Sequence, residues 1–167
     1  MVDNTQTTPK IEDEIREALA PDLRDGALEF ISHLNENAMT PRLWFGPGFW
    51  IVPHGDRNLF GIHIYGKNPA SDKNGWVFWF FNVGYSGDID EEIANFTRNH
   101  AGACVNCYSE CESKGVNISI FGEAYEKLCY QFPVRVDNPD AHAYEIIKKL
   151  IEYIKVAAKS SNGLHVR

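Results

Sequence analysis

The segment Trp76-Val77-Phe78-Trp79-Phe80-Phe81 is the part of the sequence that best defines the fold. Aromatic and β-branched residues favour strands, because their side chains pack well on a pleated surface. Successive side chains of a strand point to opposite faces, and in this segment both alternating sets are apolar. The segment therefore predicts a central strand that is covered on both faces.

Further strands and helices are expected on both sides of this run. Apolar patterns bounded by turn residues predict strands at 49–52, 59–65, 116–121 and 126–136. Helical periodicity predicts helices at about 9–19, 22–38, 88–100 and 139–160. Asp88 is expected to cap the third of these helices. The order ααβββαββα predicts an α+β domain, in which N-terminal, middle and C-terminal helices pack on a mainly antiparallel sheet of about five strands.

Length and composition indicate one ordinary globular domain. The chain has 167 residues, of which 44% are hydrophobic and 23% charged. We expect a single domain at 8–160, a disordered N-terminus at 1–7 and a tail at 161–167. The net charge of −7 and the lack of a basic block argue against nucleic-acid binding. Neither a signal peptide nor an apolar run long enough for a membrane appears, so we predict a cytoplasmic protein.

All four cysteines belong to one pattern, in which Cys104-x2-Cys107-x3-Cys111 is followed by Cys129. Two thiolates at C-x2-C spacing can turn toward one ion, and tetrahedral zinc takes four such ligands. The predicted hairpin at 116–136 would bring Cys129 back to the loop. We therefore predict one structural zinc ion per chain, held by Cys104, Cys107, Cys111 and Cys129. Because four protein ligands close the coordination shell, such an ion stabilises the fold and does not catalyse.

Other interpretations of the cysteines stay open. An iron–sulfur cluster also takes four cysteines, and thiols without metal, including a thiol-redox role, fit the same residues. A disulfide is disfavoured by a reducing cytoplasm. His100 lies four residues before Cys104 and could replace one sulfur ligand if Cys129 points away.

Twelve aromatic residues lie between Trp44 and Tyr85. They fit either a core rich in rings or an aromatic-lined sheet face that binds a small aromatic or apolar molecule. Alternation along 59–65 sets His63 and Tyr65 on the face opposite Phe60, Ile62 and Ile64. The residues expected to line this pocket are Trp44, Trp50, His63, Tyr65 and Trp79.

No catalytic motif of a known type appears in the sequence. The first hypothesis is therefore a non-enzymatic, zinc-stabilised binding domain, and the alternative is a protein-interaction or regulatory adaptor with an exposed aromatic patch. An enzyme comes third, with His63, Tyr65 and Glu123 as the polar groups to test. The sequence does not define an oligomeric state.

Several stretches resemble a family of small cytoplasmic bacterial proteins of uncharacterised function. They are Met39-Thr40-Pro41-Arg42-Leu43-Trp44, Trp50-Ile51-Val52, the cysteine loop with its following hairpin cysteine, and Asn138-Pro139-Asp140 at the start of a helix that contains Ile147-Lys148-Lys149-Leu150. The resemblance covers most of the chain. It implies a stand-alone cytoplasmic domain with the same metal site, and it implies no particular activity or substrate.

Overall fold

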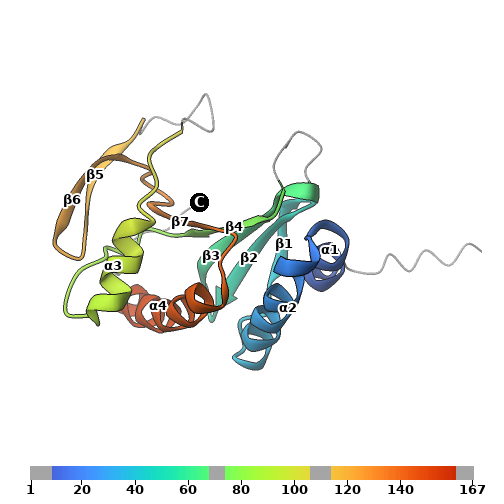
Figure 1. Cartoon of the computed structure of the whole chain (residues 1–167). Coiled ribbons are helices and arrows are strands. Elements are labelled where there is room, and N and C mark those ends of the chain that lie inside the picture. Colours follow the sequence, from blue (N-terminus) through green and yellow to red (C-terminus); the bar gives the residue numbers. More distant parts are fainter. Residues whose placement is uncertain (1–8, 68–73, 106–113, 161–167) are drawn as a thin grey trace, which may run out of the picture.

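The computed structural model describes residues 9–67, 74–105 and 114–160, and it confirms the predicted α+β class. The main sheet has five antiparallel strands in the spatial order β1-β2-β3-β4-β7 (Figure 1). The run at 76–81 contains the whole of β4, whose neighbours are β3 and β7, so the prediction of an interior strand is confirmed. The strands are β1 (Arg42–Gly46), β2 (Phe49–His54), β3 (Arg57–Ile64), β4 (Trp76–Phe80) and β7 (Val134–Asp137).

Helices cover one face of this sheet (Figure 1). They are α1 (Ile11–Ala18), α2 (Pro21–Glu36) and α4 (Ala141–Ser160), while α3 (Glu91–Asn99) packs beside α4 and a short 3₁₀ turn η1 (Tyr65–Lys67) follows β3. Within the residues that the structure describes, no helix combines the length and the apolar character needed to cross a membrane. The predicted N-terminal segment 1–7 and the tail 161–167 lie outside the described residues.

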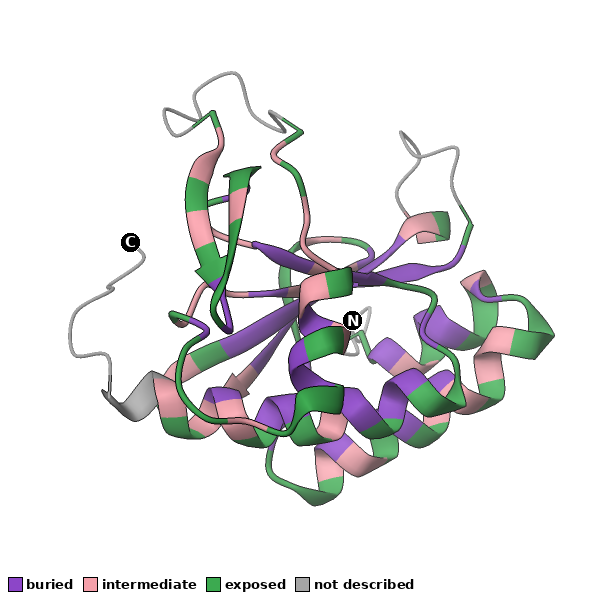
Figure 2. Cartoon of the chain, turned by 60° about the vertical axis from the view of Figure 1, so that its left-hand side comes forward, coloured by how far each residue is buried: buried purple, intermediate pink, exposed green. Residues whose placement is uncertain are grey.

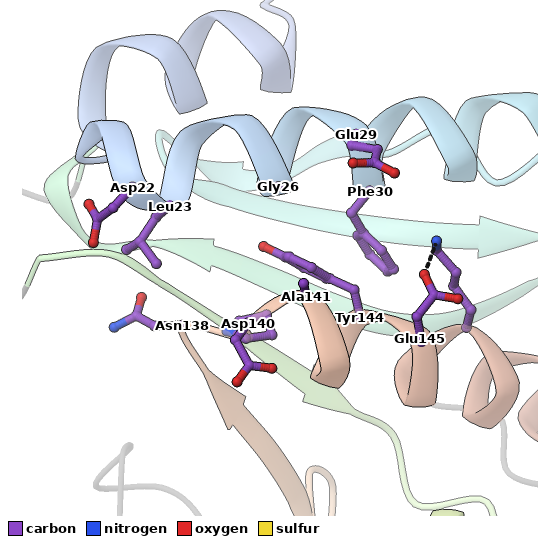
Figure 3. A pocket seen from close by; sticks show the side chains of 12 residues that line it. Asp22, Leu23, Gly26, Glu29, Phe30, Asn138, Asp140, Ala141, Tyr144 and Glu145 are labelled. Carbon is purple, nitrogen blue, oxygen red and sulfur yellow. Dashed lines mark hydrogen bonds and ion pairs between the residues drawn. The ribbon is translucent and has the colours of Figure 1, made fainter.

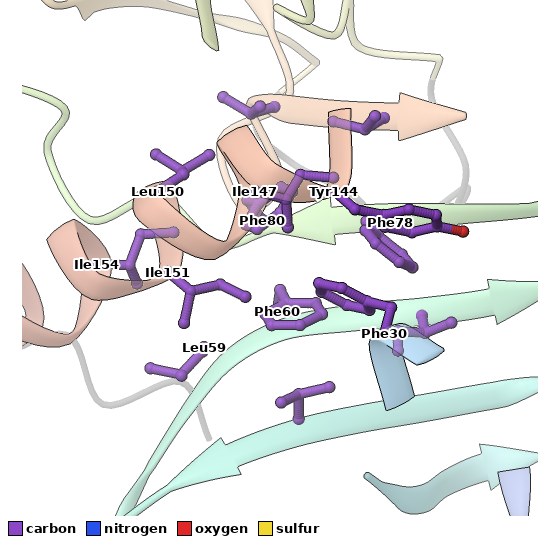
Figure 4. Close-up of a cluster of buried hydrophobic side chains, with 14 of the residues drawn as sticks. Phe30, Leu59, Phe60, Phe78, Phe80, Tyr144, Ile147, Leu150, Ile151 and Ile154 are labelled. Carbon is purple, nitrogen blue, oxygen red and sulfur yellow. The ribbon is translucent and has the colours of Figure 1, made fainter. Parts of the chain in front are cut away.

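The core lies between the helices and the sheet and combines aliphatic side chains with a group of packed rings (Figure 4). Phe30 of α2 stacks on Phe78 of β4 at a centroid distance of 5.3 Å and on Tyr144 of α4 at 5.1 Å. Phe60 of β3 extends the stack to Phe80 of β4 at 5.2 Å. Each buried ring of this kind contributes about 1.5–3 kcal/mol through the hydrophobic effect. The stack fixes α2 and α4 against the middle of the sheet.

A separate hairpin of β5 (Val116–Ile120) and β6 (Glu123–Leu128) projects away from the helical layer (Figure 2). The turn between these strands is at Phe121-Gly122, and both residues have positive φ. The segment after α3 connects this hairpin to the main sheet. Ala101 bridges Val134 of β7, and Ala103 bridges Leu128 of β6. This segment therefore covers the outer edge of β7.

Two predicted boundaries are wrong in detail. The strand expected at 126–136 is two strands, β6 and β7, because the chain leaves the hairpin after Leu128 and joins the main sheet at Val134. Pro133 lies in the break, where its missing N–H costs no ladder hydrogen bond. The cap of α3 is Asp90 and not Asp88, since the Asp90 carboxylate accepts a hydrogen bond from the Glu92 amide at 2.9 Å.

Two hydrogen bonds between Trp76 and Asn138 hold the segment before α4 against β4. The Trp76 amide donates to Oδ1 of Asn138 at 2.9 Å, and the Asn138 amide donates to the Trp76 carbonyl oxygen at 2.9 Å. Gly75, with φ of +94°, makes room for this contact, because a Cβ there would lie 2.0 Å from Asn138 Oδ1. Asp140 then caps the helix by accepting from the Ala143 amide at 2.8 Å.

Candidate functional site

The sheet face opposite the helices carries a continuous group of rings, which we call the aromatic face. The strand register sets Phe49 opposite His63 and Gly61 opposite Trp79 on this face. Among the described elements, no helix lies on this side of the sheet (Figure 1). The aromatic face consists of Trp44, Phe45, Phe49, His63, Tyr65, Trp79, Phe81 and Phe132, joined by ring contacts.

His63 lies within a stack at the centre of the aromatic face. Its imidazole is nearly parallel to Phe49, with ring centroids 3.9 Å apart and 15° between the planes. Trp79 lies 5.4 Å away and Tyr65 4.9 Å away, the latter edge-on. The rings cover one another and leave His63 only 6% exposed. The prediction that β4 is covered on both faces is therefore confirmed. Helices cover one face, and aromatic side chains of the sheet itself cover the other.

Trp44 belongs to the edge strand β1, and its indole extends over the aromatic face. A two-residue register shift in β1, between Leu43 and Gly46, displaces it from the regular ladder. The indole lies over Gly61, where an added Cβ would be 3.7 Å from Cζ3 of Trp44. Trp44 keeps 37% of its surface exposed and Phe45 keeps 53%. These two residues form the most accessible part of the aromatic face.

Polar groups lie at one border of the aromatic face. The Tyr65 hydroxyl donates a hydrogen bond to Oδ1 of Asp137 at 2.7 Å. Burial raises the pKa of Tyr65 above its usual value, and the hydrogen bond to Asp137 raises it further. The phenol therefore stays neutral at physiological pH and donates its proton in a hydrogen bond to the carboxylate.

Trp50 does not belong to the aromatic face, which corrects the predicted pocket. It is paired with Ile62 of β3, and both point into the core on the helical side. Its Nε1 donates to Oε2 of Glu14 at 2.7 Å, and the Gly48 amide donates to the same oxygen at 3.1 Å. The other four predicted pocket residues, Trp44, His63, Tyr65 and Trp79, lie together. Sequence reasoning missed Phe132, which reaches the face from the segment before β7 and carries no local signal for it.

The three groups suggested for an enzyme do not converge. His63 and Tyr65 are neighbours on the aromatic face. Glu123 starts β6 in the separate hairpin, and its carboxylate lies 3.8 Å from Nε of Arg98 on α3. The trio of His63, Tyr65 and Glu123 therefore does not form one site.

The described part of the cysteine cluster comprises Cys104 and Cys129, while Cys107 and Cys111 lie outside the described residues. The Cys104 amide donates to the Lys127 carbonyl oxygen at 2.8 Å, and the Cys129 amide donates to the Gly102 carbonyl oxygen at 3.2 Å. The bridge between Ala103 and Leu128 therefore places Cys104 and Cys129 on adjacent hydrogen-bonded segments.

Two further contacts bear on metal binding. The Phe132 amide donates a hydrogen bond to Sγ of Cys129 at 3.4 Å, and amide hydrogen bonds to sulfur are common around zinc-bound cysteines. Nδ1 of His100 lies 2.7 Å from the Phe96 carbonyl oxygen and donates to it, so Nε2 is the ring nitrogen left for a metal ion. Within 9–67, 74–105 and 114–160, no three His, Cys, Asp or Glu side chains gather around one point. Cys107 and Cys111 lie outside these ranges.

Comparison with known proteins adds no relative to this description. No protein-family model matches the chain, and neither a curated protein nor a solved structure matches it.

Proposed function

We propose that this protein is a non-enzymatic binding domain whose aromatic face takes up a small, flat aromatic or apolar molecule. The observation that carries the proposal is the layer of eight rings on the helix-free side of the sheet, with Trp44 and Phe45 still 37% and 53% exposed. Large exposed apolar patches on folded proteins mark binding sites for ligands or partners. Flat rings offer flat contact surfaces, which suits a planar ligand.

The border of the aromatic face supplies the few polar groups that orient a ligand. The Tyr65 hydroxyl and the Asp137 carboxylate lie 2.7 Å apart beside the rings. An apolar floor with a small number of fixed polar groups is the usual composition of a small-molecule site. A ligand with one hydroxyl or amine on a flat ring system would use both parts.

Titration with 2-naphthol, followed by two-dimensional ¹H–¹⁵N NMR, tests this proposal with internal controls. The chain has four tryptophans, so it gives four indole N–H signals. We expect the signals of Trp44 and Trp79 to shift, and those of Trp50 and Trp76, which lie in the core, to stay. Trp44→Ala should weaken binding about tenfold, because stacking on one ring contributes about 1–3 kcal/mol.

Val156→Ala is the matched control for that titration. Val156 is 65% exposed on α4 and lies outside the aromatic face, so its loss should leave the affinity unchanged. Equal shifts of all four indole signals, or no shift with any member of a panel of flat aromatic compounds, would contradict the proposal.

A second candidate function, a protein-interaction adaptor, is favoured by the edge strand β1. Leu43, Trp44 and Phe45 in this strand are all exposed, at 39%, 37% and 53%. An accessible apolar edge strand can pair with a strand of another chain. The aromatic face and this edge are continuous through Trp44, so a partner could use both.

Trp44→Asp is the variant that tests the adaptor function. We expect the wild-type protein to associate with itself or with a partner chain in sedimentation velocity experiments, and Trp44→Asp to sediment as a monomer, because a charge at the contact must be desolvated. Trp44 is partly exposed, so the variant should keep its fold, which circular dichroism would verify. Unchanged association by the variant would exclude β1 as the contact.

We also propose that Cys104, Cys107, Cys111 and Cys129 hold one structural zinc ion. The position of Cys104 and Cys129 on adjacent hydrogen-bonded segments and the hydrogen bond from the Phe132 amide to the Cys129 sulfur support this assignment. The cytoplasmic location predicted from the sequence would keep the thiols reduced and available. Elemental analysis of the purified, tag-free protein should find about one zinc per chain, and iron or no metal would refute the assignment.

A further inference from the structure

Arg135 of β7 brings a positive charge to the border of the aromatic face. The strand register sets it directly opposite Trp79 of β4, and residues directly opposite one another in a ladder point to the same face of the sheet. Trp79 in turn lies beside Trp44, because a Cβ added at Gly61 would be 3.7 Å from Trp44 and 3.9 Å from Trp79. Arg135 therefore belongs to the same surface as these two indoles.

This positive charge has no partner within the described part of the protein. None of the ion pairs there includes Arg135, and its buried Nε has no hydrogen-bond partner. Asp137, two positions further along β7, accepts a hydrogen bond from the Tyr65 hydroxyl at 2.7 Å instead. A shortage of carboxylates is not the reason, because the chain has 23 Asp and Glu against 16 Lys and Arg. The guanidinium is therefore available to an anion from outside the chain.

Gly102 makes room for the Arg135 side chain. A Cβ added at Gly102 would lie 3.2 Å from both Cγ and Cδ of Arg135, so a larger residue there would displace the stem. The Arg135 amide also donates to the His100 carbonyl oxygen at 2.9 Å, which fixes the backbone. Arg135 is half-buried as a whole, and since Nε is buried, a ligand would contact the two terminal nitrogens. A side chain that is already ordered loses less entropy on binding.

The charge of Arg135 acts on the polar groups at the border of the aromatic face. Burial and the hydrogen bond to Asp137 raise the pKa of Tyr65, and the charge of Arg135 opposes them. The guanidinium is therefore within electrostatic reach of the Tyr65 hydroxyl. Arg135 and Asp137 also point to the same face of the sheet, because they are two positions apart in one strand.

We propose that the ligand of the aromatic face is a planar aromatic carboxylate, whose rings pack on Trp44 and Trp79 and whose carboxylate accepts hydrogen bonds from Arg135. This inference rests on the proposed function of the aromatic face and narrows its ligand class. A carboxylate matches the planar guanidinium, which can donate to both of its oxygens at once. A doubly charged phosphate fits less well, because Asp137 would repel the second negative charge.

The groove between α2 and α4, on the helical side of the sheet, does not suit such a ligand (Figure 3). It has a volume of about 470 Å³, and three carboxylates line it, those of Asp22, Glu29 and Asp140. Among its described lining residues the one cation is Lys148, which is paired with Glu145 at 2.6 Å. An aromatic anion should therefore avoid this groove, so the signals of its residues serve as an internal control.

The probes 2-naphthoate and 2-naphthol test the inference on the wild-type protein, because they share a ring system and only the first is charged at neutral pH. In an NMR titration, 2-naphthoate should bind about tenfold more tightly and should shift the Arg135 backbone signal. The signals of Gly26 and Ala141 in the groove should stay. Added salt should reduce the difference between the probes. Equal affinity would overturn the carboxylate assignment and leave the binding function in place, whereas no binding of either probe would contradict the binding function and the inference with it.

Substitutions at Arg135 assign the difference to its charge. Arg135→Met keeps an unbranched stem over Gly102, so it should lower the affinity for 2-naphthoate about tenfold and leave that for 2-naphthol unchanged. Arg135→Lys keeps the charge but loses the planar fork, and its affinity for 2-naphthoate should fall between the two. Arg16→Met is the matched control, since Arg16 lies on α1 with 57% of its side chain exposed. Undiminished binding of 2-naphthoate by Arg135→Met would overturn the inference.

Discussion

Chelation of the proposed zinc ion is expected to lower the melting temperature by about 10 °C. A ligand present at a thousand times its dissociation constant stabilises the folded state by about 4 kcal/mol, and a chain of this size loses about 2–4 °C per kcal/mol. The effect should be large because the ion would join the segment carrying Cys104, which backbone hydrogen bonds hold to β6 and β7, to Cys129 by metal–ligand bonds. Differential scanning calorimetry with and without chelator, together with a thiol titration, measures it.

Cys129→Ser is the variant that makes this result specific. This variant lacks one proposed zinc ligand. Before chelator is added, its melting temperature should therefore be lower than that of the wild-type protein, and chelator should not change it. Lowering the pH should have the same effect on the wild-type protein, because thiols must lose their protons to bind zinc. A wild-type protein that melts at one temperature with and without chelator, and whose four thiols all react at once, would contradict the zinc assignment.

The strand at the centre of the sheet could be predicted because its signal is local. Alternating apolar sets in residues 76–81 require cover on both faces, and β4 has such cover. On the side away from the helices, the cover is a layer of side chains from β1, β2, β3 and the segment before β7. The strand order and the register shift in β1 decide which segments supply these side chains. Neither can be predicted from residues 76–81 alone.

The error at Trp50 has the same physical origin. Alternation along β2 separates Phe49 from Trp50, but it does not say which of them faces the helices. That choice follows from the pairing of Trp50 with Ile62 and from the contact with Glu14, which is 36 positions away in the chain.

Replacing Glu14 by alanine is expected to lower the free energy of unfolding by about 3–4 kcal/mol. Oε2 of Glu14 accepts hydrogen bonds from Nε1 of Trp50 at 2.7 Å and from the Gly48 amide at 3.1 Å. Each buried donor left without an acceptor costs about 1–3 kcal/mol. Glu14→Gln retains one carbonyl oxygen as an acceptor and should cost clearly less. Urea unfolding monitored by circular dichroism measures both variants.

Glu17→Ala is the matched control, because Glu17 lies one turn further along α1 with 71% of its side chain exposed and an ion pair to Lys67. Exposed pairs contribute at most about 1 kcal/mol.

The Glu14→Ala substitution should also change the aromatic face. Gly48, with φ of +81°, connects β1 to β2, and its carbonyl oxygen accepts from the Ile64 amide at 2.8 Å. Release of this turn should displace Trp44 and weaken aromatic ligands, whereas a Glu14→Ala protein as stable as Glu17→Ala would show that Glu14 does not hold the hairpin in place.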